Sequence, residues 1–182
     1  EIANKPIQSE LETYYAEKYY QKPSVQYHKN YSEDELEFFS NRGLICLHTV
    51  KKILPNISSF FEIGCGEGFF ANTIYKTGVK DIVLNDFSDA GLTQFNPHLK
   101  KYHKKTDIFK HINELVKENK KFDLISMDNV LEHVINPESL LENVKLIMHK
   151  KSILRITVPN DFSEFQNMLL EEEITTDTWV SP

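Results

Sequence analysis

The sequence predicts an α/β domain built on a doubly wound, mostly parallel sheet with helices on both faces. Two observations support this fold class. From Ser59 onward, short apolar runs alternate with helix-like stretches, and a glycine-rich turn directly follows the first apolar run. Strands that alternate with helices build parallel sheets, because each return to the sheet needs a crossover that covers one of its faces.

The alternating part of the chain is expected to hold five strands and four helices. The strands are predicted over Phe60–Ile63, Asp81–Asn85, Tyr102–Lys105, Phe122–Met127 and Ile153–Val158. The helices are predicted over Gly68–Lys76, Asp89–Phe95 and His111–Asn119, and from Asn136 to about Met148. Pro137 fits the first turn of the last helix, where the missing amide of proline is not needed.

The segment before these elements has a different composition, so the chain is divided into a helical cap or lid over residues 1–54 and a main domain over 55–182. Six of the eight tyrosines lie in the first 31 residues, and a short helix is predicted near Ser9–Tyr20. Ser32 followed by Glu35 is typical of a capping box. The helix behind it should end before Pro55, with Gly43 as a candidate break.

The stretch Glu62–Gly68 is the strongest functional signal. It ends a strand and opens a helix, and its glycines let the backbone turn sharply and approach a ligand closely. The spacing is GxGxG, whereas the dinucleotide pattern GxGxxG would need a third glycine where Phe69 stands. Glu62 and Glu67 favour a ligand that carries an ammonium and a sulfonium over pyrophosphate. The Walker pattern is also absent, because no Gly-Lys-Ser/Thr follows the loop. The alternative to a ligand site is a glycine turn that serves only packing.

Two acidic residues follow the next two strands. Asp86 lies twenty positions beyond Gly66, where a carboxylate can accept both hydroxyls of a ribose. Asp107 follows the third strand and is a candidate acceptor for an adenine amino group, with Phe87 or Ile108 against the ring. Taken alone, each aspartate is also typical of a turn at the end of a strand.

Composition excludes several classes of protein. The chain has 182 residues, 40% of them hydrophobic, which is enough for one domain with a core. Its net charge of −6 argues against a nucleic-acid partner, although a basic cluster runs from Lys100 to Lys110. Cys46 and Cys65 provide neither a disulfide framework nor metal-site spacing. The sequence has no long apolar run and no signal peptide, so a cytoplasmic protein is expected. Because the chain opens on Glu1, it is also expected to be a piece of a longer protein.

Taken together, these motifs resemble the class I S-adenosylmethionine-dependent methyltransferases. The resemblance is to the small-molecule group related to the ubiquinone-biosynthesis methyltransferases. Besides the glycine loop, it rests on the run Phe122–Val134, which ends in Leu-Glu-His-Val, on Asn136-Pro137-Glu138, and on Arg155–Asn160. It covers roughly Ile53 to Asn160. The resemblance implies a Rossmann-like fold, S-adenosylmethionine as cofactor and S-adenosylhomocysteine as product.

The family pattern also implies roles for individual residues. The residues implied to hold the cofactor are Glu62 and the loop residues Gly64, Cys65, Gly66 and Gly68 for the methionine end, Asp86 for the ribose, Asp107 for the adenine with Phe87 or Ile108 against its ring, and Met127 and Asp128 near the methyl group. Asn129 is placed on the substrate side. His133 is either a general base for a hydroxyl acceptor or a structural histidine. Tyr27 and Tyr31 either form part of a lid over the cofactor or simply pack against the sheet. No metal is implied.

The chain departs from the family pattern in two places. The family has two further strands after the fifth, so the C-terminal strands are expected to be truncated here. The usual glycine pair before the fifth strand is replaced by His149–Ser152, so that turn must differ. The leading hypothesis is a small-molecule methyltransferase, most simply an O-methyltransferase. The alternatives are an RNA methyltransferase domain that uses Lys100–Lys105, and a cofactor-binding partner subunit without catalysis.

Overall fold

The computed structural model describes residues 10, 13–14, 30–160 and 163–171. In that part of the chain, five strands form one sheet in the order β3-β2-β1-β4-β5, and all four neighbouring pairs are parallel. The strands are β1 Ser59–Ile63, β2 Asp81–Asp86, β3 His103–Lys105, β4 Phe122–Asp128 and β5 Met148–Thr157. The predicted fold class is therefore confirmed.

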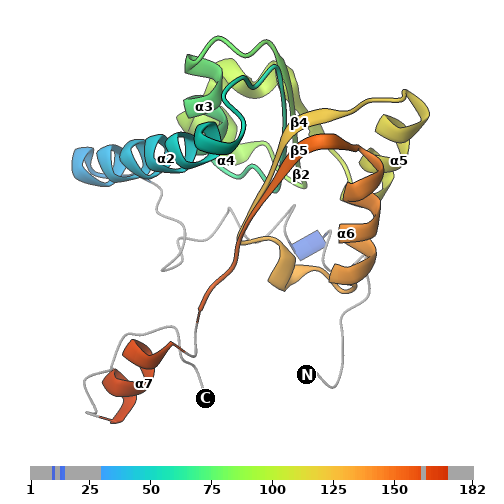
Figure 1. Ribbon diagram of the computed structural model, residues 1–182. Coiled ribbons are helices and arrows are strands. Elements are labelled where there is room, and N and C mark those ends of the chain that lie inside the picture. Colours follow the sequence, from blue (N-terminus) through green and yellow to red (C-terminus); the bar gives the residue numbers. More distant parts are fainter. Residues whose placement is uncertain (1–9, 11–12, 15–29, 161–162, 172–182) are drawn as a thin grey trace.

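Helices cover both faces of this sheet (Figure 1). The helices on the sheet are α2 Glu33–Ile53, α3 Phe69–Lys76, α4 Ala90–Phe95, α5 Ile108–Lys117 and α6 Pro137–Leu146, with two 3₁₀ turns, η2 Pro97–Tyr102 and η3 Leu131–His133. A further helix, α7 Glu164–Glu171, follows β5 and lies apart from the sheet in Figure 1. Alternate side chains of β1 belong to two separate hydrophobic cores. Phe60 packs with residues of α2, α3 and α4, whereas Phe61 packs with residues of α5 and α6. Both rings are fully buried, as expected for a central parallel strand.

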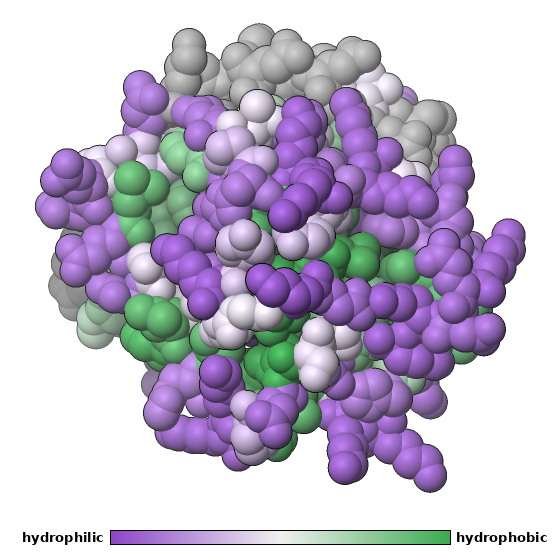
Figure 2. All heavy atoms as spheres, turned by 90° about the horizontal axis from the view of Figure 1, so that it is seen from above, coloured by the Kyte–Doolittle hydropathy of each residue, from purple (hydrophilic) through white to green (hydrophobic). Residues whose placement is uncertain are grey.

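The face seen in Figure 2 is mainly hydrophilic, with hydrophobic residues showing in patches between the hydrophilic ones. Among the exposed apolar side chains, Phe38, Ile45 and Ile53 all belong to α2. The opposite side of this helix is buried through Leu47 and Val50, so α2 is amphipathic and covers the sheet with α3.

The start of α2 confirms the predicted capping box. The Ser32 hydroxyl accepts a hydrogen bond from the Glu35 amide, and the Glu35 carboxylate accepts one from the Ser32 amide at 2.8 Å. The predicted break at Gly43 is wrong, because the helix runs through it. This glycine serves packing instead. A Cβ there would lie 2.4 Å from Thr73 Oγ1, so its absence lets α2 and α3 approach closely.

Two element boundaries differ from the prediction by more than two residues, and the others agree more closely. α5 begins at Ile108 instead of His111, because the Asp107 carboxylate caps it by accepting from the Lys110 amide at 3.0 Å. β5 begins at Met148 instead of Ile153. Its first residues form an irregular start: Phe122 pairs with Met148 and Leu124 with Ile153, so β5 advances five residues while β4 advances two.

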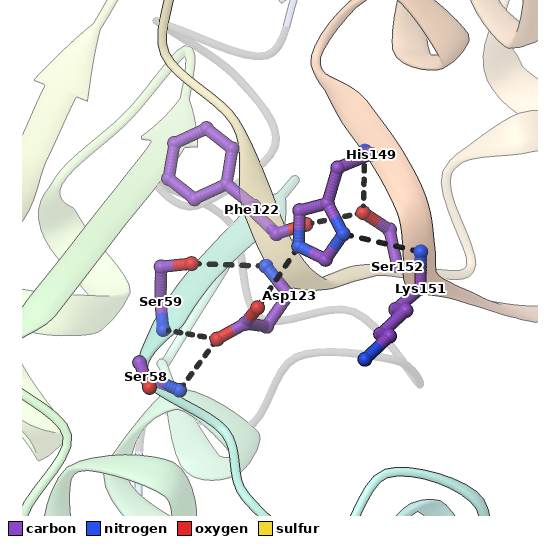
Figure 3. A network of polar contacts seen from close by, with 7 residues as sticks. All are labelled: Ser58, Ser59, Phe122, Asp123, His149, Lys151 and Ser152. Carbon is purple, nitrogen blue, oxygen red and sulfur yellow. Dashed lines mark hydrogen bonds and ion pairs between the residues drawn. The ribbon is translucent and has the colours of Figure 1, made fainter.

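Side chains hold this irregular start in place (Figure 3). The Ser152 hydroxyl donates to the Phe122 carbonyl at 2.6 Å and accepts from the His149 amide at 2.7 Å. The Lys151 amide donates to His149 Nδ1 at 3.2 Å. Local side-chain bonds thus replace the ladder bonds that the extra residues cannot make.

Asp123 is the centre of the same network. Its carboxylate accepts from the amides of Ser58 and Ser59 at 2.7 and 3.1 Å, and it lies 2.9 Å from His149 Nε2. Since Nδ1 of this histidine accepts from Lys151, the proton of the neutral ring is assigned to Nε2, which donates to Asp123. Burial raises the pKa of Asp123, but the hydrogen bonds from Ser58, His149 and Ser59 outweigh it and leave the pKa below its usual value.

We expect Asp123→Ala to lower the free energy of unfolding by about 2 kcal/mol at pH 7, because two backbone amides lose their acceptor. Urea unfolding measures this. The folded pKa of Asp123 is depressed, so its contribution is present above the unfolded value of about 3.9 and is lost as the pH falls below it. The deficit should therefore shrink in acid. Glu142→Ala, on the exposed part of α6, is the control, and an Asp123→Ala chain as stable as this control would contradict the assignment.

Candidate functional site

The candidate site lies where the order of the sheet reverses. β1 has β2 on one side and β4 on the other, and the chain builds outward from β1 to β3 before it crosses back to β4. In open α/β sheets, ligands bind beside the carboxyl ends of the strands at such a switch point. Here the glycine loop follows β1, while Asp86 and Asp128 end the two neighbouring strands.

The glycine loop has the backbone conformation that the sequence predicts. Gly64, Gly66 and Gly68 have φ values of +66°, +51° and +74°, in the left-handed region that glycine favours. The amides of Gly64 and Cys65 both donate to the Asn85 carbonyl, at 2.8 and 3.0 Å. The side chain of Cys65 is buried, and burial raises the pKa of its thiol, so this cysteine is no nucleophile.

α4 supports the loop from behind, and this contact was not predicted from the sequence. A Cβ on Gly91 would lie 2.9 Å from the carbonyl carbon and oxygen of Gly66 and 3.0 Å from the amide nitrogen of Glu67. Asn96 donates from Nδ2 to the Glu67 carbonyl at 2.8 Å. A glycine in the first turn of a predicted helix is unfavourable by propensity, and this was the available signal for a close approach.

The environment of Glu62 is suited to binding a positively charged group. Its side chain is 3% exposed, and its Oε2 has no hydrogen-bond partner among the described residues. Burial, followed by repulsion from Asp128, raises its pKa to about 8, although Arg155 opposes this shift. A buried carboxylate without a partner is unfavourable. The ammonium group of an amino-acid moiety would supply the missing donor, so this residue fits the implied cofactor.

Asp128 lies between two arginines that sequence reasoning also missed. Arg42 of α2 donates from Nη2 to both carboxylate oxygens, at 3.0 and 3.2 Å. Arg155 of β5 donates to Asp128 Oδ2 at 3.2 Å and to the Ser126 hydroxyl at 3.0 Å. Arg155 also lies 4.8 Å from the centre of the Phe70 ring. These contacts bind α2, β4 and β5 together beside Glu62.

The other predicted cofactor residues lie around the same edge. Asp86 accepts from the Gly66 amide at 2.9 Å and from the Ser88 amide at 3.1 Å. Burial raises its pKa to about 6, opposed by these hydrogen bonds. Phe87 is half-buried, and Ile108 and Met127 are buried, the latter in the core beneath α5 and α6. Their cofactor roles, and that of the α5 cap Asp107, stay predictions.

The residues predicted for the substrate side lie on different segments of the chain and make different contacts. His133 ends η3 and is half-exposed, with Nε2 3.8 Å from Glu132 Oε1. Asn129 has a left-handed φ of +52° and donates its amide to the Thr157 carbonyl at 2.9 Å. Tyr31 donates its hydroxyl to Glu67 Oε1 at 3.0 Å, which places it at the glycine loop. Tyr27 lies outside the described residues. The roles of these residues also stay predictions.

Two of the five lysines in the basic cluster form ion pairs with neighbouring carboxylates. Lys100 pairs with Asp89 at 2.7 Å, and Lys104 pairs with Glu114. Lys101 lies over the ring of Tyr102 at 4.9 Å. Because β3 is an edge strand, lysines here also discourage pairing with another chain. This arrangement weakens the interpretation of the cluster as a phosphate-binding surface.

The described part of the chain contains neither a membrane-spanning helix nor a cluster of metal ligands. None of its helices combines the length and the apolar character that a membrane crossing requires. The same residues contain no group of three or more histidine, cysteine, aspartate or glutamate side chains arranged to hold a metal ion.

Comparison with known proteins agrees with this geometry. Residues 28–179 match the family described as "Methyltransferase domain". A ubiquinone biosynthesis O-methyltransferase from Pelagibacter ubique (strain HTCC1062) is 29% identical over 109 residues, which cover 60% of this chain and 45% of that protein. The chain therefore spans less than half the length of this curated relative.

Solved structures share the fold. A SAM-dependent methyltransferase from Archaeoglobus fulgidus superposes with a TM-score of 0.58 at 20% identity, covering 81% of this chain and 63% of that one. The plantazolicin methyltransferase, solved with SAH and a pentazolic desmethylPZN analog, gives a TM-score of 0.52 at 21% identity, covering 80% and 52%. At these identities the likeness shows the fold alone.

Proposed function

Because the chain belongs to the family of methyltransferase domains, we propose that the protein transfers a methyl group from S-adenosylmethionine to a small molecule. The observation that carries this proposal is the buried Glu62 carboxylate. Its Oε2 has no hydrogen-bond partner among the described residues, and it lies two residues before the first of three left-handed glycines at the switch point of the sheet. A cofactor with an ammonium group fits this combination.

Different residues along this edge of the sheet would bind different parts of the cofactor. Glu62 would accept from the ammonium, and the loop backbone would lie against the methionine moiety. Asp86 would accept from the ribose hydroxyls while it keeps its bond to the Gly66 amide. Asp107, Phe87 and Ile108 would border the adenine.

The proposed chemistry is an in-line displacement. The acceptor atom attacks the sulfonium methyl carbon, the new bond forms as the carbon–sulfur bond breaks, and the electron pair stays on sulfur. S-adenosylhomocysteine leaves, and the acceptor's proton passes to a base or to water. The main contribution of the protein would be alignment at near-attack distance with water excluded. His133, half-exposed after β4, is the candidate base for a hydroxyl acceptor.

We further propose that the acceptor is the hydroxyl of a small molecule and that residues 1–54 form a cap or lid over the site. The similarity to a ubiquinone biosynthesis O-methyltransferase supports the first point. The packing of α2 against α3, beside the glycine loop, supports the second. The local pairing of Lys100 and Lys104 makes RNA the weaker candidate.

The experiment is to incubate the intact gene product with methyl-labelled S-adenosylmethionine and panels of hydroxylated small molecules and of RNA. Labelled O-methyl products from the small molecules are expected. Label in RNA alone would contradict the proposed substrate class. Tight binding of S-adenosylhomocysteine in calorimetry without any turnover would favour the cofactor-binding subunit instead.

A further inference from the structure

We propose that Tyr31 is a positioning residue, which holds the glycine loop in its cofactor-binding conformation by donating a hydrogen bond to Glu67. The inference rests on the proposed function, because it concerns the same cofactor site. It assigns Glu67, the second acidic residue of the loop, to anchoring the loop and not to contact with the ligand.

Glu67 is the only polar side chain by which the loop itself can be held. Between Gly64 and Gly68 the only side chains are those of Cys65 and Glu67, and Cys65 is buried in the apolar core. The Glu67 carboxylate accepts from the Tyr31 hydroxyl at 3.0 Å. Burial raises the pKa of Glu67, while the bond from Tyr31 opposes this shift and therefore stabilises the ionised form.

Tyr31 is itself held rigidly, so its hydroxyl has a defined direction. Its ring lies 5.1 Å from that of Phe39, 5.8 Å from that of Phe69 and 4.9 Å from that of Phe95. Phe39 and Phe69 stack on each other at 4.6 Å. The three phenylalanines come from α2, α3 and α4, so this aromatic cluster joins the helices that surround the loop.

Two residues of the α4 region contact the backbone of Glu67. The Asn96 side chain donates to its carbonyl, and Gly91 lies close behind its amide. Glu67 is thus held by its backbone from α4 and by its carboxylate from Tyr31. A segment with three left-handed glycines loses much conformational freedom when a ligand orders it. Holding it beforehand lowers that cost and strengthens binding.

The test is calorimetric titration of the intact protein with S-adenosylhomocysteine. Tyr31→Phe keeps the ring and its three aromatic neighbours but removes the donor, and it should weaken binding about tenfold. Glu67→Ala should weaken binding by a similar factor, and the double variant should lose little more, because both changes break one interaction. Glu67→Gln keeps an acceptor oxygen and should recover part of what Glu67→Ala loses.

Tyr75→Phe is the matched control. It removes a hydroxyl from another half-buried tyrosine, at the far end of α3, and should bind like the native protein. If Tyr31→Phe binds S-adenosylhomocysteine with native affinity, the inference is overturned. It is also overturned if the fold losses of affinity in the two single variants multiply in the double variant. Failure of the native protein to bind S-adenosylhomocysteine would overturn the proposed function as well, so the two failures are distinguishable.

Discussion

Replacing Gly66 with valine should weaken S-adenosylhomocysteine binding by at least about 100-fold, because it places backbone strain within the loop that is proposed to hold the cofactor. Gly66 has a φ of +51°, a genuine outlier for a β-branched residue. Its amide donates to Asp86, and its carbonyl group already touches Gly91, so the backbone has no room to relax. Calorimetry with the intact protein measures the loss directly.

Gly78→Val is the matched control, because it introduces backbone strain away from the glycine loop. Gly78 also has a positive φ, of +91°, but a Cβ there would meet no atom within 4 Å, and the residue lies beyond the far end of α3. We expect Gly78→Val to lower the midpoint of thermal unfolding by an amount similar to Gly66→Val, because the backbone strain is similar. Its affinity for S-adenosylhomocysteine should be unchanged. Binding by Gly66→Val within a factor of ten of the native protein would refute the central role of the loop.

The affinity for S-adenosylhomocysteine should rise with pH between about 6 and 8, by nearly tenfold per unit well below pH 8. Without ligand, the pKa of Glu62 is about 8, so at pH 6 the side chain is protonated and must lose its proton before it can pair with the ammonium. The experiment is calorimetry in buffers of different ionisation enthalpy, which counts the protons released on binding.

Stability without ligand should change in the opposite direction. The folded pKa of Glu62 is raised from 4.5 to about 8, so the folded state binds an extra proton between these values. The contribution of this group to stability is present below about pH 4.5 and is lost as the pH rises through 8. Thermal unfolding across this range measures the loss.

Glu62→Gln is the control for both results, because it keeps the shape of the side chain without its charge. Its stability should lack the fall that the titration of Glu62 causes as the pH rises through 8. Its binding should retain only the pH dependence that comes from Asp86 and from the ligand's own groups. At pH 8 it should bind at least about 30-fold more weakly than the native chain. If the native and Glu62→Gln proteins show the same pH dependence of binding, Glu62 does not meet the ammonium.

The sequence predicted those parts of the molecule that depend on local pattern. The alternation of strands and helices, the capping box at Ser32 and the left-handed glycines all follow from residues close together in the chain. The start of β5 did not, because it depends on a network that joins Asp123 to His149 and Ser152. Arg42 was missed for the same reason: its partner Asp128 is 86 residues away, and only the fold brings them together.

Glycine illustrates the same limit. At Gly64, Gly66 and Gly68 the spacing alone indicated a ligand loop. At Gly43 and Gly91 the glycine allows a close approach between segments that are distant in sequence. From the local pattern alone, a glycine inside a helix, such as Gly43, indicates only a possible break. The contact that explains each of them, with Thr73 and with the backbone of Gly66, could not be read from the chain.

The two outer strands of the sheet also differ in how readily they would accept another strand. β3 has three residues, two of them lysines, so it offers a short and charged border. β5 has ten residues and borders only β4 in the described part of the chain, with Ile156 exposed on it and Val158 exposed just beyond it. Backbone groups along such a border attract further strands. In concentrated solution, self-association of this polypeptide should therefore begin along β5, and a lysine at position 156 should raise its solubility.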